Sequence, residues 1–249
     1  MMKVSLHFPG KVEENVILHD DSGKIVWLTS FLKNVRMLEN KRYLSYSGEW
    51  KKKPVTLIAT KMGAPNTALV VDEIADLGAK NIIKLGTFGA IQKGVAVGDI
   101  YMPTDAIRTD GVTEAYARAS YPAKPSPKLA KLAEAVAKGQ GIEARNGTIW
   151  TASAYQPVML NSSPDKRFRI STWKGKAFGV EMETSALFVC ASLKKTHALA
   201  LLICNRDWET IDGYRKGETV DWNVYRESDV YAKSLLKLAE LALGVIEKL

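Results

Sequence analysis

Short apolar runs alternate along this chain with longer segments in which apolar residues recur at helical spacing. The runs predict β-strands, and the longest is almost uninterrupted by polar residues, which is typical of a strand buried on both faces. Strands are expected at residues 16–18, 54–60, 81–85, 99–102 and 198–204. The three lysines at 51–53 are expected to form the solvated tip of a hairpin.

Helical periodicity occupies much of the remaining chain. Between residues 66 and 77 the apolar positions form one face, and Gly78 is a favourable stop. A proline-rich loop ends at Pro127, which suits the first turn of a helix. Helices are therefore expected at 66–77, 181–193 and 224–249, and after Pro127. This alternation predicts an α/β fold: a single domain over residues 1–249, built as a sandwich with a central mixed, largely parallel β-sheet flanked by helices.

Composition narrows the class of protein without locating a site. Of the 249 residues, 46% are hydrophobic and 25% are charged, as in ordinary globular proteins. The net charge of +8 favours anionic partners, but no basic stretch is interleaved with stacking aromatics, so we expect no nucleic acid partner.

Two further features concern location. No apolar run reaches the roughly 18 residues that cross a bilayer, and the first residues lack the apolar core of a signal peptide, so we expect no membrane partner and a cytoplasmic location. Cys190 and Cys204 lie in apolar runs and are expected to be reduced core thiols; two cysteines make neither a disulfide framework nor a metal cage.

Polar chemistry follows three of the expected strands, at residues 60–65, 86–89 and 205–207. Ligands of parallel sheets bind at the carboxyl ends of the strands, so these segments are candidates for a site. In the second segment, glycines allow the backbone to approach an anion, Thr87 adds a hydroxyl donor and Lys84 adds a charge. The same glycine spacing also occurs in plain turns, so both interpretations stay open.

Two acids, Glu181 and Glu183, open one of the expected helices. Residues two apart do not share a helical face, so one of them can point into a cleft. A carboxylate only accepts hydrogen bonds, which suits the paired hydroxyls of ribose. Acids in a first helical turn also stabilise the helix dipole without any ligand.

Four segments then occur in one order over most of the chain: residues 61–66, 77–92, 97–99 and 179–186. Together they resemble the nucleoside phosphorylase superfamily, whose members include uridine phosphorylases, hexameric purine nucleoside phosphorylases and adenosylhomocysteine nucleosidases. The resemblance implies the sandwich fold and a pentosyltransferase that cleaves the N-glycosidic bond of a nucleoside. It further implies inorganic phosphate as co-substrate, with no other cofactor and no metal.

The resemblance implies a role for each matching residue. The residues that match a phosphate site are Lys24, Arg42, Lys84 and Thr87, with Arg42 reaching across a subunit interface. Those that match ribose contacts are His7, Met182 and Glu183, where Glu183 holds the 2′ and 3′ hydroxyls and His7 reaches the neighbour's 5′-hydroxyl. Those that match base contacts are Tyr155, Gln156 and Arg206, and the expected catalytic residues are Arg206 and Glu183. Contributions across subunits imply a homo-oligomer, with a hexamer built from dimers as the family's form.

The chain departs from the family at the phosphate site. Lys24 stands where a Gly-Asp-Pro-x-Arg stretch of the family ends in arginine, and Lys84 also replaces an arginine. Lysine keeps the charge but loses the bidentate fork that fits phosphate, so weaker phosphate binding is expected. Asp20 and Asp21 oppose phosphate if they point inward.

At the base site, the pair Asn205–Arg206 resembles that of uridine phosphorylases, whereas purine members carry Ser-Asp. The Gln-x-Arg pattern of uridine phosphorylases is missing, with Gln156 and Asn161 as the available substitutes. The expected function is therefore phosphorolysis of uridine or a related nucleoside. The alternatives are a purine nucleoside phosphorylase, a hydrolytic nucleosidase on the same fold, and a non-catalytic nucleotide-binding protein.

Overall fold

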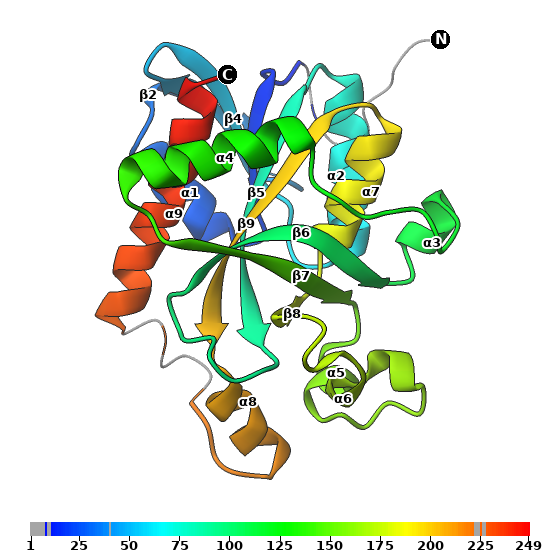
Figure 1. Ribbon diagram of the computed structural model, residues 1–249. Helices are drawn as coiled ribbons and strands as arrows, with labels where there is room; N and C mark the ends of the chain where they lie inside the picture. Colours follow the sequence, from blue (N-terminus) through cyan, green and yellow to red (C-terminus); the bar gives the residue numbers. More distant parts are fainter. Residues whose placement is uncertain (1–7, 9–10, 40, 222–224, 226–227) are drawn as a thin grey trace.

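A mixed β-sheet organises the chain (Figure 1). The structure, a computed structural model, describes residue 8, residues 11–39, 41–221, residue 225 and residues 228–249. Within these ranges the strands are β1 (Asn15–His19), β2 (Lys33–Glu39), β3 (Ser45–Trp50), β4 (Lys53–Ala59), β5 (Asn81–Ala90), β6 (Ile100–Thr109), β7 (Ala144–Ala152), β8 (Gly179–Glu181) and β9 (His197–Arg206). The helices are α1 (Ser22–Thr29), α2 (Ala64–Asp76), α3 (Thr113–Tyr116), α4 (Pro127–Gln140), α5 (Tyr155–Met159), the 3-10 turn η1 (Lys166–Phe168), α6 (Ile170–Trp173), α7 (Thr184–Leu193), α8 (Trp208–Arg215) and α9 (Asp229–Glu247).

Parallel pairing holds the centre of the sheet. The strand β1 lies parallel between β4 and β5, and β5 also pairs in parallel with β9. At one edge β2, β3 and β4 form antiparallel hairpins, and Lys51 and Lys52 make the tip between β3 and β4, as expected. At the other end the sheet curls on itself, because β8, β7 and β6 connect β5 back to β9. The predicted mixed α/β fold is confirmed.

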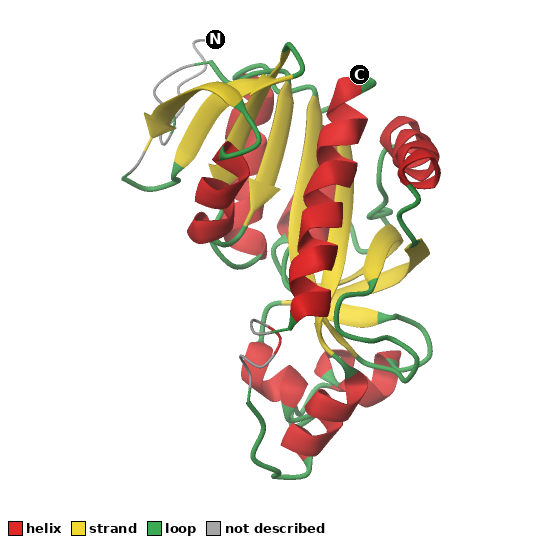
Figure 2. Cartoon of the chain, turned by 90° about the vertical axis from the view of Figure 1, so that its left-hand side faces the viewer, coloured by secondary structure: helices red, strands yellow, loops and turns green. Residues whose placement is uncertain are grey.

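Helices cover both faces of the sheet. On one face α1, α4 and α9 pack against inward residues such as Ile83 and Leu201. On the other face α2 and α7 pack against the alternate residues, such as Ile82 and Leu202. Figure 2 shows the long helix α9 lying across the first face. Successive residues of β9 point to opposite faces of the sheet, and helices cover both faces. The strand therefore needs an apolar side chain at nearly every position, which explains its almost continuous apolar run.

A smaller apolar cluster lies at the carboxyl end of the sheet. Trp150, Ile170, Trp208 and Ile211 belong to it, and it joins α5, α6 and α8 to the ends of β7 and β8. Figures 1 and 2 show these short helices gathered below the strand ends. They form one wall beside the place where ligands of such sheets bind. In the described part of the chain, no helix has the length and apolar character needed to span a bilayer.

Three sequence expectations are corrected. The strand predicted at 81–85 runs on to Ala90, so Gly86 and Gly89 lie inside β5 and not in a turn after it. The helix predicted from residue 181 begins at Thr184, because Glu181 ends β8 and pairs through it with β7. The final helix begins at Asp229, capped by the hydroxyl of Ser228, and not at residue 224.

Candidate active site

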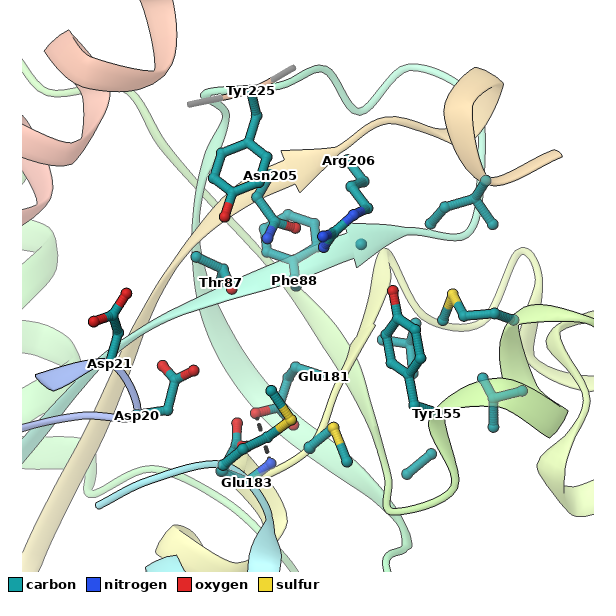
Figure 3. A pocket seen from close by; sticks show the side chains of 18 of the residues that line it. Asp20, Asp21, Thr87, Phe88, Tyr155, Glu181, Glu183, Asn205, Arg206 and Tyr225 are labelled. Carbon is teal, nitrogen blue, oxygen red and sulfur yellow. Dashed lines mark hydrogen bonds between the residues drawn. The ribbon is translucent and has the colours of Figure 1, made fainter. Parts of the chain in front are cut away.

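A pocket of about 600 Å³ opens at the carboxyl ends of the central strands (Figure 3). It lies where the three segments predicted from the sequence converge, namely residues 60–65 after β4, residues 86–89 at the end of β5 and residues 205–206 at the end of β9, and the residues that follow β1 join them. The predicted site residues that line it are Lys24, Thr87, Tyr155, Met182, Glu183 and Arg206. Six residues that were predicted from separate parts of the chain therefore share one cavity.

A buried ion cluster forms the floor of this pocket. The Lys84 ammonium lies 3.2 Å from Glu181 Oε2 and 3.3 Å from Glu183 Oε2, and all three side chains are nearly inaccessible. Burying one charge among two opposite charges is tolerable only when each is paired and hydrogen-bonded. The cluster is therefore a fixed part of the structure that depends on all three residues.

Glu181 is an anchor for the backbone. Its carboxylate accepts hydrogen bonds from the backbone N–H groups of Glu183 and Thr184 and from the Thr151 hydroxyl. It thus satisfies the amides at the start of α7, which would otherwise be orphaned. This explains why Glu181 precedes the helix and is not part of it.

Glu181 and Glu183 both line the cavity, and Glu183 also holds a neighbouring loop. Its Oε1 accepts a hydrogen bond of 2.7 Å from the backbone N–H of Gly63, which draws the loop before α2 against the site. Gly63 has φ of 101°, a conformation that favours glycine. The segment 60–65, predicted to contribute to the site, does so through this backbone contact and through Met62, which lines the pocket.

The cluster shifts the acid–base behaviour of its members. Burial raises the pKa of Glu183, the carboxylates of Glu181 and Asp20 add to this, and Lys84 only partly opposes them, so the pKa is about 7. Burial disfavours the charged form of Lys84, but Glu181 and Glu183 outweigh it and raise the pKa of Lys84 above its usual value. Lys84 is therefore charged at neutral pH, whereas Glu183 titrates there.

The predicted phosphate contact from Lys84 is not what the structure shows. Lys84 does not line the pocket, and its ammonium is engaged by the two glutamates. The glycine beside it serves this arrangement, because a Cβ on Gly86 would lie 2.5 Å from Lys84 Nζ. Gly86 therefore makes room for the lysine side chain. The expectation that Gly86 turns backbone amides toward an anion is corrected.

The far wall of the pocket is aromatic and cationic. Arg206 comes from the end of β9, its guanidinium carbon lies 5.5 Å from the centre of the Tyr225 ring, and Tyr155 lies on the same side of the cavity (Figure 3). Asn205 is only 7% exposed, and its Oδ1 has no hydrogen-bond partner among the described residues. A planar, partly polar ligand fits between such groups.

Three other candidates lie outside the pocket, and a fourth is not among the described residues. Gln156 is exposed and accepts a hydrogen bond from the Tyr214 hydroxyl, and Asn161 accepts from Ser171; neither lines the pocket, so the substitutes expected for the Gln-x-Arg pattern are not in place. Arg42 is exposed and lies outside the pocket of its own chain. Its predicted phosphate contact therefore requires the pocket of a neighbouring subunit. His7 lies outside the described residues.

Comparison with known proteins identifies the family. The model of the phosphorylase superfamily matches residues 16–243. The chain belongs to the phosphorylase superfamily. This membership confirms the predicted family and its enzyme class.

The relatives of this chain are named for different bases. A uridine phosphorylase of Haemophilus influenzae is 28% identical over 78% of this chain and 82% of its own length. A DeoD-type purine nucleoside phosphorylase of Alkaliphilus metalliredigens is 30% identical over 78% of this chain and 82% of its length. A uridine phosphorylase of Thermococcus kodakarensis is 33% identical, but over 46% of this chain and 42% of that protein.

Solved structures agree on the fold. A purine nucleoside phosphorylase of Toxoplasma gondii in complex with immucillin-H superposes with a TM-score of 0.85 at 21% identity, covering 100% of this chain and 98% of that one. A uridine phosphorylase of Vibrio fischeri superposes with a TM-score of 0.84 at 23% identity, covering 100% and 99%. The phosphorylase sandwich is therefore shared over the whole chain.

Several pocket residues were not predicted as ligands. They include the carboxylates of Asp20 and Asp21, the ring of Tyr225, and Phe88 and Asn205 on β5 and β9. The polar residues at 19–21 and 205 were visible in the sequence, whereas Tyr225 fell at the start of the helix expected over residues 224–249 and nothing there pointed to a ligand. Only its position in space brings it to Arg206.

We expect Lys84→Met to destabilise the protein by about 3–5 kcal/mol, because it leaves Glu181 and Glu183 buried without their shared cation. Chemical denaturation measures this. Lys80→Met is the matched control, since Lys80 pairs with Glu14 at the surface, where solvent screens the pair, and its loss should change stability far less. Equal effects at both positions would contradict the structural role given to Lys84.

Nucleoside binding should weaken as the pH falls through about 7, because Glu183 then gains a proton and loses its capacity to accept from two hydroxyls. The sign follows from the raised pKa: the required carboxylate is the form present above it. Affinity measured from pH 5.5 to 8.5 checks this. Glu183→Gln should bind weakly with no inflection near 7; an unchanged inflection in this variant would assign the titration to another group.

Proposed function

We propose that this chain is a nucleoside phosphorylase that transfers the ribose of uridine, or of a related nucleoside, to inorganic phosphate. The observation that carries the proposal is that one pocket is lined by three kinds of group: a hydroxyl and a cation (Thr87 and Lys24), a buried carboxylate (Glu183), and a guanidinium with a tyrosine ring (Arg206 and Tyr155). These groups match the three parts of the reaction, which are an anion, a sugar and a base.

The sugar is fixed by Glu183. Its carboxylate accepts hydrogen bonds from the 2′ and 3′ hydroxyls, while Met182 packs against the ring. Holding the sugar rigidly aligns its anomeric carbon with the attacking oxygen. The acids at the floor also stabilise the positive charge that grows on the sugar as the glycosidic bond stretches.

Phosphorolysis then proceeds without a further cofactor. A phosphate oxygen forms the bond to C1′, the N-glycosidic bond breaks, and its electron pair leaves with the base. Thr87 donates a hydrogen bond to phosphate and Lys24 supplies a positive charge. Lys84 acts indirectly, by keeping Glu183 in place. We propose no metal and no organic cofactor in this reaction.

The base is recognised at Arg206. A guanidinium offers only donors, so it suits a carbonyl oxygen such as those of uracil and stabilises charge that develops there. The exocyclic amine of adenine cannot accept from it. Hypoxanthine and guanine also carry a carbonyl, and relatives of comparable identity include a guanosine phosphorylase of Halorubrum lacusprofundi. A 6-oxopurine nucleoside is therefore the second candidate substrate.

The assembly we propose is a homo-oligomer, a hexamer built from dimers. It is supported by Arg42, a cation exposed outside the pocket of its own subunit. In such an assembly Arg42 and His7 would complete the phosphate and ribose sites of a neighbour. Free, buried Cys190 and Cys204 fit the cytoplasmic location that we also propose.

The proposed reaction predicts stimulation by phosphate and a preference for carbonyl-bearing bases. Uridine, inosine, guanosine and adenosine should each be incubated with and without phosphate, following free base and ribose 1-phosphate by chromatography. We expect uridine to be the best substrate, the 6-oxopurine nucleosides weaker and adenosine weakest. No free base from any of these nucleosides would refute the proposed function, and preferred adenosine would refute the assignment of Arg206.

Arg206→Leu should lower kcat/KM for uridine by roughly 10²–10³-fold, the scale for losing a donor to a developing oxyanion. The KM for phosphate should change less than threefold, because Lys24 and Thr87 remain. Arg215→Leu is the matched control, since Arg215 lies on α8 near Trp208 and does not line the pocket. Unchanged uridine kinetics in Arg206→Leu would mean that this arginine is structural.

A further inference from the structure

Near Thr87 and Lys24, where phosphate is proposed to bind, the pocket contains a carboxylate at a position where the family pattern has none. When Lys24 is matched to the arginine that ends the Gly-Asp-Pro-x-Arg stretch, the glycine position falls on Asp20. Asp20 lines the pocket, and Figure 3 shows its carboxylate directed into the space between Thr87 and Glu183. The chain thus places a negative charge next to the position proposed for phosphate.

This carboxylate is held ionised. His19 Nδ1 lies 3.0 Å from Asp20 Oδ1, and the His19 side chain is only 4% exposed. Burial opposes ionisation of Asp20, whereas the hydrogen bond and charge of His19 when its imidazole is protonated, together with the charge of Lys84, favour it and lower the pKa of Asp20. A phosphate dianion entering this site therefore meets a fixed negative charge at neutral pH.

The groups that would attract phosphate are already engaged. Lys84 is paired with Glu181 and Glu183. The backbone N–H of Gly23, at the start of α1, donates to Asp21 Oδ1 over 2.7 Å, so a carboxylate of the chain occupies the place where a helix start would bind an anion. Thr87 and Lys24 are left to hold phosphate against the two aspartates.

Water, a neutral acceptor of the ribosyl group, is favoured by a nearby carboxylate, whereas phosphate is repelled by it. Water donates a hydrogen bond to a carboxylate and is oriented by it, and a carboxylate beside C1′ stabilises the cationic sugar. Because the glycosidic bond stretches before attack, the water becomes strongly acidic only as its oxygen bonds to carbon. A carboxylate with a low pKa is basic enough to take that proton.

We propose that Asp20 makes water a competing acceptor, so that the protein releases free ribose alongside ribose 1-phosphate. The proposal rests on the nucleoside-cleaving function above. In the hydrolytic turnover the water oxygen bonds to C1′, the N-glycosidic bond breaks, and its electron pair leaves on the base nitrogen. The proton of water passes to Asp20 and then to solvent, and the base is reprotonated from solvent.

The experiment measures both products with the purified full-length protein. Free ribose and ribose 1-phosphate are separated by chromatography over a phosphate series that includes none. The wild type should release free ribose and base in equal amounts without phosphate. Asp20→Asn should lower this phosphate-free rate at least tenfold and lower the phosphate concentration for half-maximal rate at least threefold. Asp20→Gly, which restores the glycine of the family pattern, should move both quantities in the same directions.

Asp21→Asn is the comparison that separates a specific role from simple charge removal. It removes the same charge from the same pocket, and asparagine still caps α1. We expect it to lower the phosphate-free rate less than threefold. Equal losses of phosphate-free rate at both positions would refute the specific role of Asp20.

The outcomes also separate this inference from the proposed function. Base release that is strictly phosphate-dependent, with no free ribose, would overturn the inference and leave the phosphorylase assignment intact. Base release that is absent under every condition would overturn the proposed function itself. An Asp20→Asn variant that loses phosphorolysis and hydrolysis in equal proportion would show that Asp20 only maintains the fold of the site.

Discussion

The buried ion cluster of Lys84, Glu181 and Glu183 is the interaction on which the site depends. Lys84 comes from the middle of β5, Glu181 ends β8, and Glu183 precedes α7 while holding the Gly63 amide before α2. Charges this deep in the protein are stable only when they neutralise one another, so their pairing fixes the relative positions of these elements. The acid that faces the ligand is thereby held by the same contacts that hold the fold.

The same cluster biases the chemistry of the pocket. With Asp20 nearby, the floor carries more carboxylate than ammonium, which favours a sugar on its way to a cation. A carboxylate-rich floor also opposes a phosphate dianion. In the proposed reaction, one electrostatic arrangement would therefore help bond breaking and hinder the binding of phosphate, and the balance between Thr87 and Lys24 on one side and Asp20 on the other would decide which acceptor is used.

The base side is built by other means. Arg206 projects from the end of β9, Tyr155 begins α5 beside the small apolar cluster, and Tyr225 packs against Tyr231 of α9. Few charges tie these groups to the floor. Substitutions there can change which base is accepted without disturbing the ion cluster, which agrees with the presence of both pyrimidine and purine enzymes among the relatives of this chain.

The sequence was sufficient to predict the α/β fold class and the burial of β9 on both faces, since periodicity is a local pattern, and its family motifs predicted six of the residues that line the pocket. It placed Lys84 on phosphate, because a lysine near glycines looks the same whether it faces a ligand or two glutamates. Only the tertiary structure joined residues nearly a hundred positions apart, turned Lys84 inward, and brought Asp20 and Tyr225 into the cavity. Pairing of buried charges depends on distance in space, and no local pattern in the chain encodes that distance.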